Sequence, residues 1–103
     1  MRIAIVSTNG RDVNEHFGKA SRFLIYELGE TGLVPIEERP VEPLYTGDLA
    51  LAFDSLKFDE IVRTIGDCQR VYVTKIGPRP SVELDGAGIT TVLYNGPISE
   101  IRS

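Results

Sequence analysis

The segment 14–20 carries the only histidine of the chain, His16. This histidine follows a short apolar run and stands directly before Phe17 and Gly18. A neutral imidazole is a common metal ligand, and a glycine two residues later lets backbone and ligand approach closely. A single loop histidine is more often an ordinary surface residue. The setting of His16 therefore makes it a candidate metal ligand whose support must come from the rest of the chain.

Other reactive residue types give weaker signals. Cys68 precedes an apolar run, and its neighbour Asp67 does nothing to create a reactive thiolate, so we expect a small buried hydrophobe. Gly77 and Pro78 precede a candidate helix whose backbone amides could bind an anion, although such a pair also punctuates loops. The chain has no G-x-S-x-G motif, and its first strand lacks the carboxylate of a two-metal nuclease. We therefore expect a non-catalytic binding or carrier protein.

Composition limits the class of protein. With 103 residues, of which 42% are hydrophobic and 25% charged, the chain is expected to form one domain over residues 1–103. Its net charge of −4 argues against nucleic acid as a partner. One cysteine excludes an internal disulfide and favours a reducing cytoplasm. The short apolar start predicts neither a signal peptide nor a membrane span.

Four apolar runs predict strands, each followed by glycine, proline or polar residues, and segment 33–39 is expected to return as the hairpin partner of the second run. The predicted strands lie at 3–6, 23–28, 33–39, 70–74 and 90–94. Pro35 and Pro40 remove backbone donors from the third of these, which should therefore lie at an edge of the sheet. A final turn is expected after Pro97.

Two helices are expected among the later strands. The first is indicated by the i, i+3, i+4, i+7 spacing of Phe58, Ile61, Val62 and Ile65. A shorter helix at 81–87 would end at Gly88. The segment 49–53 fits an earlier turn of the first helix or a separate piece. The order β-β-β-α-β-α-β predicts a three-layer α/β domain, a mixed five-stranded sheet with helices on its faces.

This topology places a site at one edge of the sheet. Ligands of open α/β sheets bind beyond the carboxyl ends of the strands. If the first strand lies beside the strand at 70–74, loops 7–10 and 75–79 meet there, close to the loop of His16. Five basic residues lie in or beside these loops, namely Arg11, Lys19, Arg22, Lys75 and Arg79. They form either an anion-binding cluster or a set of solvated loop charges.

The chain resembles the dinitrogenase iron–molybdenum cofactor biosynthesis family over nearly its whole length. The similarity is carried by the first strand, by segments 14–20 and 23–26, and by segments 67–71 and 75–78. The His-Phe-Gly element combined with the Ile-Gly loop is fairly specific. The family includes NifX-like and NafY-like nitrogen fixation accessory proteins and the C-terminal domain of NifB. Segment 43–56 has no counterpart in this pattern.

The resemblance implies a ribonuclease H-like fold and a carrier of iron–molybdenum cofactor, its precursor, or a related molybdenum, iron or copper sulfide cluster. Proteins that donate or accept the cluster would be its partners. Because such cargo is anionic, glycines, backbone amides and basic side chains around one imidazole suit it. The predicted cluster-binding residues, with His16 as the metal ligand, are Asn9, Gly10, His16, Phe17, Gly18, Lys19, Arg22, Ile76, Gly77 and Arg79.

Two functions of other classes stay open at this point. The same loops could bind a protein partner in an adaptor or regulatory protein, or the Gly77 loop could bind a small anion without any cluster. Free-standing family members also occur outside nitrogen fixation, so the resemblance leaves open a role in nitrogenase maturation. The sequence also leaves the oligomeric state open.

Overall fold

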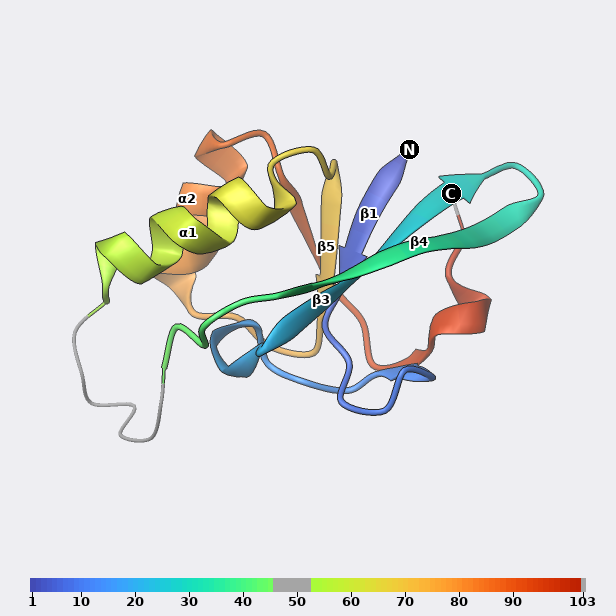
Figure 1. Cartoon of the computed structure of the whole chain (residues 1–103), viewed down its shortest axis with the longest axis horizontal. Coiled ribbons are helices and arrows are strands. Elements are labelled where there is room, and N and C mark those ends of the chain that lie inside the picture. Colours follow the sequence, from blue (N-terminus) through green and yellow to red (C-terminus); the bar gives the residue numbers. More distant parts are fainter. Residues whose placement is uncertain (46–52, 103) are drawn as a thin grey trace.

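The computed structural model describes residues 1–45 and 53–102. Five of its strands form one mixed sheet in the order β4-β3-β1-β5-β6 (Figure 1). Their bounds are Arg2–Ile5 for β1, Arg22–Gly29 for β3, Gly32–Pro40 for β4, Arg70–Val73 for β5 and Thr90–Leu93 for β6. β5 runs parallel to both β1 and β6, whereas β3 is antiparallel to β1 and to β4. The predicted mixed five-stranded sheet, with the first strand beside the strand at 70–74, is confirmed.

β4 forms one edge of this sheet, as its prolines predict. Its pairing with β3 is interrupted by a register shift, because Tyr26 pairs with Pro35 and Ile25 with Glu37. The intervening Ile36 is left without a β3 partner and is 43% exposed. Prolines and bulges of this kind keep an edge strand from pairing with other chains.

Two α-helices connect the later strands, and their ends follow ordinary capping chemistry. α1 (Ser55–Ile65) begins after Asp54, whose carboxylate accepts hydrogen bonds from the backbone N–H groups of Leu56 and Lys57. α2 (Pro78–Gly86) begins three residues earlier than predicted, because proline at the first helical position is favoured rather than disruptive. Among the residues that the structure describes, no helix is long and apolar enough to cross a membrane.

The helix α2 is terminated by a glycine in the left-handed region, as the sequence predicts. Gly88 has a φ of +83°, and the N–H of Ile89 donates to the carbonyl of Leu84 at 2.9 Å, so the predicted glycine termination is confirmed. Of the segment 49–53, all but Phe53 lies outside the described residues. Phe53 itself belongs to no helix.

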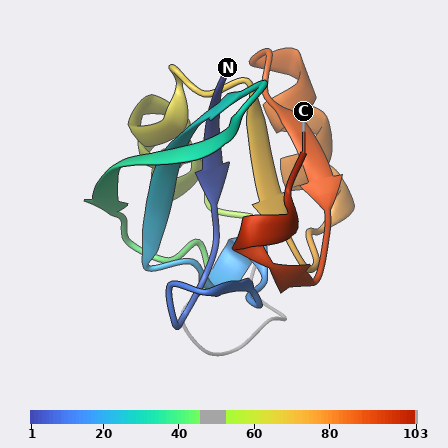
Figure 2. The ribbon, with the colours of Figure 1, turned by 90° about the vertical axis from the view of Figure 1, so that its right-hand side faces the viewer.

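Both α-helices lie on the same face of the sheet, so the predicted three-layer arrangement with helices on its faces is wrong (Figure 2). Phe58 and Ile61 of α1 and Leu84 of α2 join one core with Val71 and Val73 of β5. The reason lies in the winding: β4 to β5 and β5 to β6 cross the sheet in the same direction, and right-handed crossovers of one direction share a face. The ribonuclease H-like classification stays a prediction.

The opposite face of the sheet is covered by short pieces instead of a helix. β2 (Asp12–Val13) pairs with β7 (Gly96–Pro97), and a 3₁₀ turn, η2 (Ile98–Glu100), follows as the predicted final turn. Their buried side chains form a second core with the strands, which contains Ile3, Ile5, Val13, Leu28, Tyr72, Ile98 and Ile101. Two-residue strands are too short to produce an alternating pattern, so the sequence did not reveal β2 and β7.

Ion pairs at the N-terminal end of β1 and β5 tie three elements together. The carboxylate of Asp67, directly after α1, accepts hydrogen bonds from Arg39 of β4 at 2.6 and 3.0 Å and from Arg2 of β1 at 3.0 Å. Arg39 also donates to the carbonyl of Thr64 at 2.9 Å. These hydrogen bonds, chiefly those from Arg39, hold the pKa of Asp67 below its usual range.

Replacing Asp67 by asparagine is expected to lower the free energy of unfolding at pH 7 by about 1 kcal/mol. This loss is the upper limit for exposed ion pairs, which applies because the Asp67 side chain is 43% exposed. Since its folded pKa is depressed, this stabilisation is present above about pH 4 and is lost as pH falls through the folded value. Urea unfolding of both proteins at pH 7 and pH 2 measures the difference, which should shrink at pH 2.

The matched control is Glu60→Gln, which breaks the Glu60–Arg63 pair of α1. These two side chains are 72% and 68% exposed, so the stability of this variant should equal that of the parent at both pH values. An Asp67→Asn difference that stays constant between pH 7 and pH 2 would contradict the assigned role of the carboxylate.

Candidate functional site

Two backbone hydrogen bonds join the loop of His16 to the loop that follows β5. The N–H of Phe17 donates to the carbonyl of Lys75 at 2.9 Å, and the N–H of Thr74 donates to the carbonyl of Glu15 at 3.1 Å. The Glu15 carboxylate also accepts the backbone N–H of His16 at 2.8 Å. The predicted meeting of these two loops is therefore confirmed, and the backbone of His16 is held from both sides.

Phe17 anchors this loop in the core. It opens the 3₁₀ turn η1 (Phe17–Lys19), and its side chain is fully buried. Its ring lies 6.2 Å from the ring of Phe23 and 6.3 Å from that of Phe58, measured between centroids. Phe17 therefore fixes the position of His16 from beneath and is not itself a lining residue of the cavity above it.

A cavity of about 220 Å³ opens where the two loops meet. Five of its lining residues belong to the predicted set, namely His16, Gly18, Lys19, Ile76 and Gly77. Tyr45 and Lys75 complete the lining. We call this space the His16 cavity.

The charge of the His16 cavity comes from lysine side chains. Lys19 and Lys75 are both exposed at its rim, and none of the lining residues that the structure describes is acidic. Within the described part of the chain, neither lysine forms an ion pair. An anion entering this cavity would therefore meet positive charge from the described residues of its wall.

The N-terminus of α2 contributes less than the sequence predicts. Pro78 and Pro80 have no N–H, so Arg79 supplies the single backbone donor among the first three helical residues. The N–H of Ser81 already donates to the carbonyl of Gly77 at 3.2 Å. The anion cradle expected from helix amides is therefore reduced to one group, and lysines carry the electrostatics.

Four other predicted residues lie away from the His16 cavity. The Asn9 amide oxygen accepts N–H groups of its own loop, from Arg11 at 2.9 Å and Asp12 at 3.0 Å. Gly10 lines a different cavity on the opposite face of the sheet.

Two predicted arginines are also occupied elsewhere. Arg22 pairs with Glu38 at 2.9 Å, and the Arg79 guanidinium lies 4.5 Å from the centroid of the Phe53 ring. Of the five clustered basic residues that the sequence suggests, the structure brings only Lys19 and Lys75 to the His16 cavity.

Tyr45 is a lining residue that no pattern in the sequence indicates. It lies in the loop after β4, where no pattern or resemblance extends, and its N–H donates to the carbonyl of Gly18 at 2.9 Å. Lys75 was recognised as a basic loop residue, but its direct neighbours Ile76 and Gly77 were the ones predicted to bind. Its position directly before these two predicted residues is the signal in the sequence that could have identified it.

Cys68 lies at the other end of β5 from the His16 cavity and is 3% exposed. Burial, assisted by the negative charge of Asp67, raises the pKa of its thiol to about 12. Because the thiolate is the form that binds metal, Cys68 is a poor ligand at neutral pH. The expectation of a small buried hydrophobe is confirmed. The described residues contain no group of three or more His, Cys, Asp or Glu side chains that could hold a metal ion.

Gly18 and Gly77 line the same cavity but should respond differently to substitution. A Cβ on Gly18 would lie 2.8 Å from Cε2 of Tyr45, so Gly18→Ala must displace this ring. A Cβ on Gly77 would meet Cδ and Cγ of Pro80 at ordinary contact distances of 3.6 and 4.0 Å. We expect altered Tyr45 ring signals in the NMR spectra of Gly18→Ala. Thermal unfolding of this variant should give a lower melting temperature than that of the parent.

Gly77→Ala serves as the matched comparison. Its melting temperature should correspond to a stability within about 0.5 kcal/mol of the parent, as for most surface substitutions. Equal effects of the two substitutions on the Tyr45 ring would contradict the packing described here.

The fold and the site together define a small α/β domain with one histidine and two lysines around a cavity. The family model described as "Dinitrogenase iron-molybdenum cofactor" matches residues 1–102. The chain belongs to this family.

Curated relatives of the chain are FeMo cofactor biosynthesis proteins NifB. The proteins of Frankia alni and Herbaspirillum seropedicae are 33% and 35% identical to it over 90 and 91 residues, which is 87% of this chain in both cases. The protein of Klebsiella pneumoniae is 30% identical over 103 residues, 96% of this chain. The matched region is 18%, 17% and 22% of these three relatives, so the chain spans about a fifth of their length.

Two solved structures have a similar fold. The crystal structure of PH0822 superposes with a TM-score of 0.69 at 23% identity, covering 97% of this chain and 85% of that one. An NMR structure of a protein from Thermotoga gives a TM-score of 0.64 at 17% identity, covering 96% and 81%. At these identities the likeness concerns the fold alone.

Proposed function

We propose that this domain binds an anionic metal–sulfur cluster in the His16 cavity and acts as a non-catalytic carrier in FeMo cofactor biosynthesis. The cargo would be iron–molybdenum cofactor, its precursor, or a related molybdenum, iron or copper sulfide cluster. The observation that carries the proposal is the joint presence of His16, Lys19 and Lys75 in one cavity, where the described lining residues include no carboxylate. Membership of the dinitrogenase iron-molybdenum cofactor family supports the choice of cargo.

Each lining group has a chemical task in this proposal. The half-buried imidazole of His16 would coordinate one metal atom through a neutral ring nitrogen. Lys19 and Lys75 would balance the negative charge of the sulfide core. The missing side chain of Gly77 would keep the wall low, so the cluster can approach the backbone there, whereas that of Gly18 makes room for the Tyr45 ring.

A carrier must also release its cargo. In this proposal the cluster binds in the cavity of about 220 Å³ with one side left exposed. A donor or acceptor protein could then approach the exposed side while His16 holds the other. The metal–sulfur bonds of the cluster would stay unchanged during binding and release. The one bond exchanged would be that between a metal atom and its ligand, His16.

Anaerobic mixing of the protein with isolated iron–molybdenum cofactor tests the proposal. After gel filtration, visible absorbance and metal analysis should place iron and molybdenum in the protein fraction, at close to one cluster per chain. A folded protein that elutes free of both metals would overturn the proposal. Binding of inorganic phosphate at the same cavity without any cluster would instead favour a small-anion binder.

Cluster affinity is expected to fall by about tenfold or more between 0.1 M and 1 M salt. Over this range the Debye length shortens from about 10 Å to about 3 Å, which screens the two exposed lysines. Titration of apoprotein with the cofactor at both salt concentrations measures the effect. In the double variant Lys19→Gln/Lys75→Gln the salt dependence should largely disappear, whereas Lys57→Gln on α1 should retain it. Equal salt dependence in the two variants would refute the electrostatic part of the proposal.

A further inference from the structure

A second cavity, of about 820 Å³, lies on the face of the sheet opposite α1 and α2. We call it the sheet-face cavity. Its lining comes from the β1–β2 loop, from β3 and β4, and from the C-terminal pieces: Gly10, Arg11, Asp12, Tyr26, Leu33, Pro97, Ile98 and Ser99. It shares no lining residue with the His16 cavity. Its volume lies in the range of small-molecule sites, about 300–1,000 Å³.

The topology explains why this cavity exists. Because both α-helices pack on one face, the described elements that cover the other are the short β2, β7 and η2, which pack over its central strands (Figure 2). The hydrogen bond from the N–H of Ile98 to the carbonyl of Arg11, at 2.8 Å, fixes this cover in place. Between the cover and the β3–β4 pair the sheet is left partly open, with Tyr26 and Leu33 as its wall.

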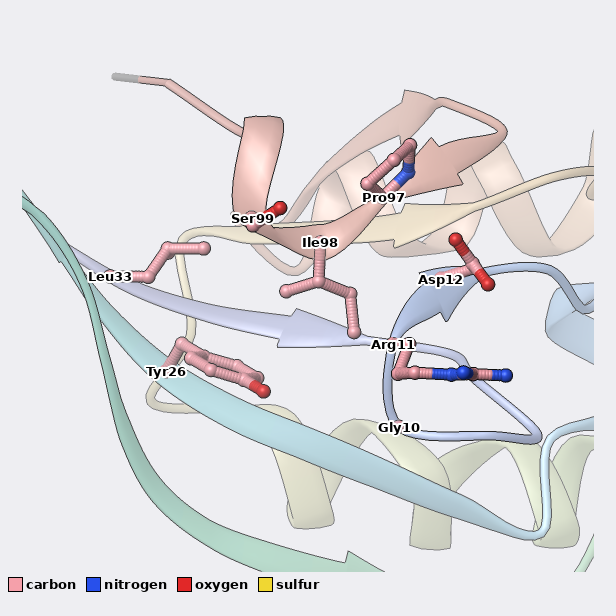
Figure 3. A pocket seen from close by; sticks show the side chains of 8 residues that line it. All are labelled: Gly10, Arg11, Asp12, Tyr26, Leu33, Pro97, Ile98 and Ser99. Carbon is pink, nitrogen blue, oxygen red and sulfur yellow. The ribbon is translucent and has the colours of Figure 1, made fainter.

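The lining of the sheet-face cavity is amphipathic. Figure 3 shows Tyr26 and Leu33 at one end, Arg11 and Asp12 at the other, and Ile98 between them. The Asp12 carboxylate accepts one hydrogen bond, from the Asn9 amide at 3.0 Å. Within the described part of the chain, neither Arg11 nor Asp12 takes part in an ion pair.

We propose that the sheet-face cavity binds a small zwitterion with a large apolar body, of the class of the aromatic α-amino acids. The carboxylate of such a ligand would pair with Arg11 and its ammonium group with Asp12. The apolar body would lie against Tyr26, Leu33 and Ile98. The charged and the apolar residues lie at opposite ends of the lining (Figure 3).

Ligands of other charge fit the lining less well. A monoanion would leave the Asp12 carboxylate uncompensated, and a monocation would do the same for Arg11. A wholly apolar ligand would remove water from both charges without replacing it, which is costly. A nucleotide carries several negative charges, whereas Arg11 is the single cation of the lining. A zwitterion is the class that engages both charged groups.

NMR titration of the cluster-free protein tests this proposal. The three probes are L-phenylalanine, 3-phenylpropanoate, which lacks the ammonium group, and 2-phenylethylamine, which lacks the carboxylate. L-Phenylalanine should give saturable shifts of amides 10–12, 26, 33, 98 and 99. Each single-charge probe should bind at least about tenfold more weakly, because it forms one charge-assisted hydrogen-bonded pair fewer.

Two variants assign the charges, and one serves as control. R11Q should reduce the affinity for L-phenylalanine to that for 2-phenylethylamine, and D12N should reduce it to that for 3-phenylpropanoate. R63Q, on the exposed surface of α1, should leave the affinity unchanged. Absence of saturable shifts, equal affinities for the three probes, or shifts confined to the His16 cavity would each overturn the proposal.

Discussion

Replacement of His16 by alanine is expected to weaken cluster binding by at least about tenfold, which is the lower end of the losses seen when metal-site residues are changed. His16 is the only imidazole of the chain and lines the cavity that we assign to the cargo. Because its side chain is half-buried and its loop is held by backbone hydrogen bonds, the fold should be unaffected. Anaerobic titration with isolated iron–molybdenum cofactor measures the affinity, and circular dichroism checks the fold.

Cys68→Ser is the matched comparison, since Cys68 is the one cysteine of the chain and the other side chain considered as a metal ligand. Burying a hydroxyl in place of the thiol should cost about 1 kcal/mol or more of stability. Binding by the folded fraction should remain, because Cys68 lies at the opposite end of β5 with a protonated thiol. Should Cys68→Ser lose the cluster while His16→Ala keeps it, the roles assigned to the two residues would be reversed.

Phe17→Ala is expected to have the largest effect on stability, a loss of about 3–5 kcal/mol in the free energy of unfolding. The Phe17 side chain is fully buried and packs against Phe23 and Phe58. Its removal leaves a void beneath the loop that holds His16. Urea unfolding at neutral pH measures the loss. Phe17→Leu, which keeps most of the buried volume, should lose clearly less.

Phe17→Ala should also weaken cluster binding when it is measured without denaturant on the folded protein. The loop would keep its backbone hydrogen bonds to Thr74 and Lys75 but lose its anchor in the core. A stability loss under 1 kcal/mol would show that the loop is held by its backbone alone. Phe17 would then have no positioning role.

The sequence was sufficient for the part of the fold that depends on apolar runs. All five strands of the sheet and both helices were predicted. Four of the strands and α1 contain a run long enough to be recognised from its apolar pattern, whereas β4 was expected as the hairpin return after β3 and α2 as a short helix before Gly88. The meeting of the His16 loop with the Gly77 loop followed from placing β1 beside β5, and the structure confirms that pairing.

The sequence was insufficient wherever the direction of the chain in space decided the outcome. That α1 and α2 share a face depends on the order of the strands in the sheet, which no local pattern encodes. The five basic residues near the loops look alike in sequence. Arg22 is paired with Glu38 across β3 and β4, however, and Arg79 stacks on Phe53.

Tyr45 shows the same limit at the scale of one residue. Its place above Gly18 results from a loop conformation after β4, and nothing in the spacing of residues around it indicates that contact. Conversely, β2 and β7 are specified by long-range pairing of two residues each. A segment of that length contains no period from which a strand could be predicted.

The central claim, that the cluster contacts His16, can be tested without mutagenesis because the chain contains one histidine. In protein labelled with ¹⁵N in its histidine ring, both ring nitrogen signals belong to His16. Stepwise anaerobic addition of isolated iron–molybdenum cofactor should shift these signals or broaden them beyond detection at one equivalent, while amides of β4 remain in place. Ring signals that stay unchanged while the cluster co-elutes with the protein would contradict the account.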